Sequence, residues 1–89
     1  MKLSIDNDVG EIDALERLAA FSASLVGQVG VERAQQCIKA AMLEAALERT
    51  GGNYGQTARL LDVTRQAVQQ MVIRFNLRTW VEERRRDAH

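Results

Sequence analysis

The most informative part of this chain is Asn53–Leu77, NYGQTARLLDVTRQAVQQMVIRFNL. Asn53 and Thr64 are residue types that favour the N-terminal cap of a helix, and each precedes a segment with helical periodicity. The stretch therefore predicts one helix over Tyr54–Leu61 and a second from Arg65 to about Phe75, joined by a tight turn.

The residues of this stretch also fit the packing of a helix-turn-helix. Ala58 is small where two helices would cross, Val63 is expected to fill the space between them, and Val68 and Met71 face back from the second helix. The second helix then keeps a free polar face. A helix of this kind is presented to the major groove of DNA.

The composition favours an all-α fold. Of 89 residues, 46% are hydrophobic but only 4% are aromatic, so the core of this one small domain is aliphatic. Proline is absent, and the abundant Ala, Leu, Glu, Arg and Gln favour helix. We predict a four-helix subunit, with helices from about Glu11 to Gln28 and from about Val31 to Thr50 preceding the helix-turn-helix; Gly51-Gly52 end the second of these.

Four regions are expected along the chain. Residues 1–10 are polar and acidic and are predicted to form a flexible arm, with a small hairpin through Leu3 and Ile5 as the alternative. Residues 11–52 hold the two N-terminal helices, and residues 53–77 hold the helix-turn-helix. Residues 78–89 form a basic tail, predicted to add one turn around Trp80 and then to fray through Arg84–Arg86.

The two N-terminal helices are predicted to form a dimeric core. The helix over 31–50 is apolar on more than one side and needs partners on each, and a small domain commonly gains stability by oligomerisation. We expect a homodimer in which these helices of both subunits build a four-helix core. Its core residues are Leu15, Leu18, Leu25, Ile38, Ala41, Met42 and Ala45, and Cys37 on the same stripe is expected to be a small buried side chain.

Charge is distributed unevenly, although the formal net charge is zero. Residues 1–30 hold two basic residues against five acidic ones, whereas residues 53–89 hold seven arginines against four acidic residues. The positive end coincides with the predicted helix-turn-helix. Such an asymmetry points to contact with nucleic acid.

The segment GGNYGQTARLLDVTRQAVQQMVIRFNL resembles the DNA-binding unit of the Fis family, which the C-terminal domains of NtrC-type activators share. The resemblance extends from about Ile38 to Leu77. It implies a homodimeric, sequence-specific transcription regulator in the bacterial cytoplasm, associated with the nucleoid, that inserts helix 65–75 into the major groove and bends DNA. The matching positions are Gly51, Gly52, Asn53, Ala58, Leu61, Val63, Thr64, Arg65 and Val68.

Three features depart from the family pattern, of which Thr57 in place of a frequent alanine is a minor one. Asp62 stands at the turn where glycine is usual, and aspartate tolerates left-handed backbone better than most residues. Gln66, Gln69 and Gln70 stand where relatives commonly carry Lys or Arg. Fewer cations predict weaker binding with a shallower salt dependence, whereas glutamine reads adenine edges. The change therefore indicates either sequence-specific recognition or a loss of DNA binding.

The predicted DNA contacts lie on three parts of the motif. Arg65 points at guanine or phosphate, the three glutamines contact bases, and Arg74 and Arg78 meet phosphates. The start of the first motif helix offers free N–H groups to a phosphate. The full predicted set is Asn53, Tyr54, Gln56, Thr64, Arg65, Gln66, Gln69, Gln70, Arg74 and Arg78.

The expected partners are double-stranded DNA and a second copy of the chain, with another regulatory protein or RNA polymerase as a further partner. No membrane span, small-molecule site, cofactor, metal site or catalytic constellation is expected, because no apolar run of sufficient length and no such motif occurs. The alternative function is a protein-interaction or antagonist module, in which the helix-turn-helix is a scaffold with weak or no DNA binding and the acidic first helix binds another protein.

Overall fold

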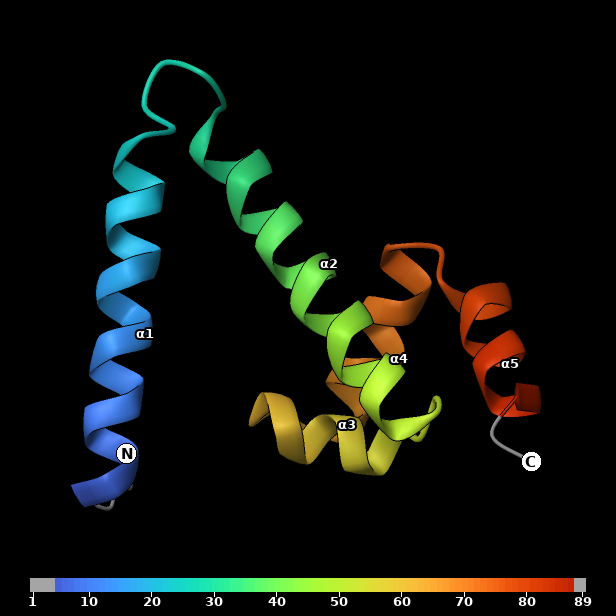
Figure 1. The fold of residues 1–89 in the computed structure, drawn as a ribbon. Coiled ribbons are helices and arrows are strands. Elements are labelled where there is room, and N and C mark those ends of the chain that lie inside the picture. The colour runs from blue at the N-terminus through green and yellow to red at the C-terminus, as the bar shows by residue number, and fades with distance from the viewer. Residues whose placement is uncertain (1–4, 88–89) are drawn as a thin grey trace. The chain divides into compact units, whose positions relative to one another are not determined.

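The computed structural model describes residues 5–87, and the regular structure there is entirely helical. The helices are α1 (Ile5–Ala23), α2 (Val31–Thr50), α3 (Tyr54–Leu61), α4 (Arg65–Arg74) and α5 (Arg78–Asp87), as Figure 1 shows. The prediction of an all-α chain is confirmed, but the described residues form five helices rather than four. The chain divides into two units, Met1–Arg33 and Ala34–His89.

In the first unit, α1 is displaced toward the N-terminus relative to the prediction. It begins at Ile5 rather than near Glu11, so residues 5–10 are helical and not a loose arm, while Leu3 of the alternative hairpin lies outside the described residues. It ends at Ala23 rather than near Gln28. The Ser24 hydroxyl donates to the Phe21 carbonyl, and the Gln28 side-chain amide donates to the Ser24 carbonyl. These bonds satisfy carbonyls at the end of the helix. Gly27, in the turn that follows, adopts positive φ.

In the second unit, one aliphatic cluster joins four helices. Leu43 and Leu47 of α2 are fully buried one turn apart, which matches the spacing of a single helix face. They pack with α3, α4, α5 and the segment between the last two helices. The other buried members of the cluster are Ala58, Val68, Val72, Leu77 and Val81, and Tyr54, Leu61, Met71, Phe75 and Trp80 pack against it half-buried.

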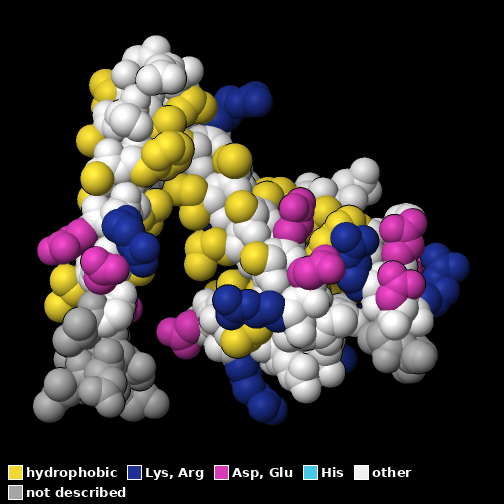
Figure 2. Space-filling model, in the orientation of Figure 1, with side chains coloured by type: hydrophobic (Ala, Val, Ile, Leu, Met, Phe, Trp, Pro, Cys, Tyr) yellow, Lys and Arg dark blue, Asp and Glu magenta, His cyan; other side chains and the backbone are white. Residues whose placement is uncertain are grey.

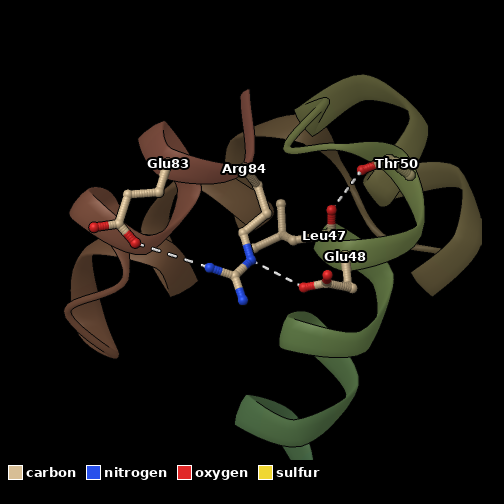
Figure 3. A network of polar contacts seen from close by, with 5 residues as sticks. All are labelled: Leu47, Glu48, Thr50, Glu83 and Arg84. Carbon is tan, nitrogen blue, oxygen red and sulfur yellow. Dashed lines mark hydrogen bonds and ion pairs between the residues drawn. The ribbon is translucent and has the colours of Figure 1, made fainter. Parts of the chain in front are cut away.

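The predicted fraying tail is instead the helix α5, which is the main correction to the expected fold. Val81 is only 1% exposed, and its N–H donates to the Leu77 carbonyl at 2.8 Å. Arg84 stacks on Trp80, with Cζ 3.8 Å from the ring centroid, and its Nε lies 2.9 Å from Oε1 of Glu48 in α2. Figure 3 shows this guanidinium between Glu48 and the carboxylate of Glu83. Trp80 is half-buried against the aliphatic cluster.

The junction between α2 and α3 is closed over by α5. Gly51 and Gly52 both have positive φ, of 64° and 86°. A Cβ atom on Gly52 would lie 2.8 Å from Cγ of Arg85 and 3.2 Å from the carbonyl oxygen of Val81. Position 52 therefore needs glycine both for its backbone conformation and for the close approach of α5.

The turn between α3 and α4 accepts aspartate at its left-handed position. Asp62 has φ 56° and ψ 46°, and its N–H donates to the carbonyls of Ala58 and Arg59. The N–H of Val63 also donates to Ala58, at 3.0 Å. These bonds satisfy the last carbonyls of α3, so the helix ends there without glycine. Val63 is 40% exposed, and the prediction that it fills the space between the helices is therefore only partly met.

Gly52→Ala should lower the free energy of unfolding by about 1–3 kcal/mol, because alanine is strained at positive φ and its Cβ crowds α5. Gly55→Ala is the matched control, since Gly55 lies in α3 and its added Cβ would meet only Asn53 Oδ1 at an ordinary 3.5 Å. The control should be neutral or stabilising by up to about 1 kcal/mol. Urea unfolding followed by circular dichroism measures both. Equal stability of the two variants would contradict this account of the junction.

Asp62→Gly should raise the free energy of unfolding by about 0.5–1 kcal/mol, because it removes the left-handed strain of a side chain at φ 56°. Asp62→Ala should lower it by about 1 kcal/mol, because alanine bears more of that strain. Asn76, at φ 58°, provides a second position where substitution by glycine should act in the same direction. Thermal unfolding of the variants tests the order Gly, Asp, Ala at position 62. A less stable Gly variant would show that the aspartate side chain contributes to the turn.

Candidate nucleic-acid interface

Both motif helices begin at side-chain caps, as predicted. Asn53 Oδ1 accepts a hydrogen bond from the Gln56 N–H at 2.9 Å, and Thr64 Oγ1 accepts one from the Ala67 N–H at 3.0 Å. Each cap satisfies one of the free amides at the start of its helix. The Thr64 hydroxyl still has its own proton to donate, so it can bind a phosphate oxygen while it caps α4.

The two faces of α4 differ sharply in exposure. Val68 and Val72 are buried in the aliphatic cluster and hold α4 against α2, α3 and α5. The solvent-exposed remainder of the helix surface carries long polar side chains, a set that we call the outward row. Its members, all exposed, are Arg65, Gln66, Gln69, Gln70 and Arg74.

One exposed apolar side chain of α4 was not predicted from the sequence. Ile73 is 66% exposed, although it lies in α4 among residues expected to pack. Its spacing of seven residues from Gln66 and four from Gln69 places it on the outward face. The exposed position of Ile73 could therefore have been predicted from this spacing. An exposed aliphatic group beside amide groups is suited to contact a thymine methyl.

The remaining predicted contacts lie at two different places. Asn53 and Gln56 are exposed at the start of α3, and Arg78 is exposed at the start of α5. Tyr54 is half-buried against the aliphatic cluster, and the guanidinium of Arg85 lies over its ring at 4.6 Å from the centroid. The Tyr54 ring therefore has a packing role, and its backbone N–H is the group placed for a phosphate.

The surface beside the turn is apolar and hollowed. A cavity of about 420 Å³ lies in the second unit and includes Met42, Val63, Met71 and Phe75 in its lining, with Lys39 and Arg74 among its polar members. Val63 thus lines an open depression and fills the space between the helices only in part. Cys37 of α2 is exposed in the single chain, contrary to the prediction that it is buried.

Within residues 5–87, no group of three or more His, Cys, Asp or Glu side chains is placed to hold a metal ion. None of the described helices combines the length and the apolar character needed to cross a membrane.

Comparison with known proteins agrees with this geometry. Residues 38–70 match a family model described as bacterial regulatory protein, Fis family. The match covers less than half of the chain and includes the later part of α2, all of α3, the turn and the first residues of α4. Searches of curated proteins and of solved structures gave no match. The predicted resemblance is confirmed over this segment: residues 38–70 are similar to the Fis family of bacterial regulatory proteins, a likeness that indicates a DNA-binding regulator.

Proposed function

We propose that the chain is a homodimeric, sequence-specific transcription regulator that inserts α4 into the major groove of DNA. The observation that carries this proposal is the division of α4 into a buried face of Val68 and Val72 and the exposed outward row. A recognition helix needs this division, because one face must be fixed by packing while the other reaches base edges.

The outward row supports direct reading of bases. Glutamine can form two hydrogen bonds to adenine through N6 and N7, and arginine can form two to guanine through O6 and N7. Arg65 and the three glutamines supply these groups, and Ile73 supplies an apolar contact for thymine. The predicted phosphate contacts flank them. These are Asn53, Tyr54, Gln56, Thr64, Arg74 and Arg78.

The proposal of a homodimer rests on apolar side chains that a single chain leaves uncovered. Leu15 of α1 is 55% exposed and Met42 of α2 is 56% exposed. Figure 2 shows hydrophobic side chains exposed on α1 and along α2. Within each helix, exposed apolar side chains of this kind form a surface suited to bind another protein chain. The other proposed core residues are exposed or half-buried, namely Leu18, Leu25, Ile38, Ala41 and Ala45.

A dimer would place two copies of α4 on successive turns of the major groove, about 34 Å apart, and bending of the DNA would adjust this spacing. Such a regulator would act at the bacterial nucleoid. Its exposed surfaces also leave room for a further regulatory protein or RNA polymerase.

The second candidate function is a protein-interaction or antagonist module. The observations that favour it are the zero net charge and the glutamines of the outward row, which do not neutralise phosphates. The acidic α1 would then bind another protein. DNA titration separates the two functions.

Fluorescence anisotropy with duplex DNA should show binding at low salt that weakens as salt rises. Arg65→Ala should reduce affinity by about tenfold or more, because it removes a charged contact at the start of α4. Arg86→Ala, which removes the same charge from an exposed position in α5, should change affinity little. Absence of binding at about 50 mM salt would overturn the DNA proposal in favour of the interaction module. An unchanged affinity of Arg65→Ala would remove only that contact.

Sedimentation should give a particle of twice the 10.0 kDa chain mass at micromolar concentration. Leu15→Ser should shift this particle toward the monomer, because the polar hydroxyl removes apolar surface from the proposed core. Leu60→Ser is the matched control, since Leu60 is 51% exposed and lies in α3, outside the proposed core. A monomer for the unsubstituted chain, or equal behaviour of the two variants, would contradict the shared core.

A further inference from the structure

A cavity of about 490 Å³ lies where α5 closes over the junction of α2 and α3. It is lined by residues 50–55 together with Arg65 and Arg85. The lining therefore contains two guanidinium groups and no carboxylate. We propose that this cavity binds a phosphodiester of the DNA backbone and that Arg85 of α5 is a phosphate-binding residue. The inference rests on the proposed DNA-binding function and extends it to a helix outside the helix-turn-helix.

The neighbouring arginines of α5 differ in how their charges are used. Arg84 lies 2.9 Å from the Glu48 carboxylate and 3.9 Å from that of Glu83, so its charge is neutralised within the domain. Within residues 5–87, Arg85 and Arg65 form no such ion pair. Their charges remain available to an anion.

Arg85 is held in place by neutral groups. Its Nε donates to the carbonyl of Gly52 at 2.9 Å, and its guanidinium lies over the Tyr54 ring. Neither partner carries a charge, so both fix the guanidinium without cancelling its charge. The planar guanidinium keeps its terminal nitrogens, and it suits the oxygens of a phosphate better than a flexible ammonium does. An oriented group also loses less conformational entropy on binding.

The same arginine adjoins the outward row of α4. A second cavity of about 370 Å³ includes Gln69, Arg78 and Arg85 in its lining. Arg78 and Arg85 are seven residues apart in α5 and so share one helix face. Glu82 also lines this second cavity, so its lining carries charges of both signs. The first cavity, whose lining has no carboxylate, is therefore the phosphate site. When Gln69 contacts a base, the backbone of the same DNA would therefore run beside Arg85.

The salt dependence of DNA binding tests the assignment. Arg85→Gln removes the charge but keeps an N–H donor for the Gly52 carbonyl. It should reduce the slope of log K against log salt by about 0.9 for each subunit that contacts DNA. Arg86→Gln is the matched control, because it removes the same charge from the next exposed position of α5 and should leave the slope unchanged. Arg85→Lys keeps the charge and should keep the slope.

A purely structural role of Arg85 would lower the melting temperature of Arg85→Gln while leaving the slope equal to that of Arg86→Gln, and this result would overturn the assignment.

If Arg85→Gln does not fold, side-chain NMR of the unsubstituted protein tests whether Arg85 contacts DNA. The Nε–H signal of Arg85 should shift on addition of duplex DNA more than that of Arg84, and equal or absent shifts would overturn the assignment. No DNA binding by the unsubstituted protein would overturn the proposed function as well, whereas binding with equal slopes would overturn only the role of Arg85.

Discussion

The close approach of α5 to the backbone of Gly52 is the constraint on which the second unit depends. Val81 places its carbonyl and its side chain against Gly52, and the Arg85 Nε binds the Gly52 carbonyl. The chain can make this approach only because position 52 lacks a Cβ and adopts positive φ. This contact therefore fixes how α5 lies against the junction of α2 and α3.

Buried polar groups reinforce the same junction. Thr57 is fully buried in α3, and its hydroxyl lies 2.8 Å from that of Thr50 at the end of α2. The Thr50 hydroxyl also accepts from the Asn53 N–H, and the Asn53 side chain caps α3. A buried hydroxyl without such a partner would cost about 1–3 kcal/mol. These hydrogen bonds thus link the orientation of α3, the first helix of the helix-turn-helix, to the end of α2, which precedes it.

Features set by local chemistry could be predicted from the sequence, whereas those set by distant contacts could not. The caps at Asn53 and Thr64 and the left-handed turn at Asp62 depend on hydrogen bonds between groups three or four residues apart, and the structure confirms them. The helix α5 depends on burial of Val81 and on a carboxylate in α2, 36 residues from Arg84. Its run of charged residues by itself indicates a solvated tail. Ile73 was given no role from the sequence, although its spacing from Gln66 and Gln69 places it on the exposed side of α4.

The outward row has a consequence for how such a regulator would be distributed over a chromosome. Non-specific affinity arises almost wholly from phosphate neutralisation, while the far larger number of non-specific sites competes with each operator. With three glutamines among its five members, the outward row would gain less from random DNA than a row of cations, and its amides would gain hydrogen bonds only where the bases match. Fewer molecules would then be held on bulk DNA, and operator occupancy would respond more directly to the number of copies in the cell.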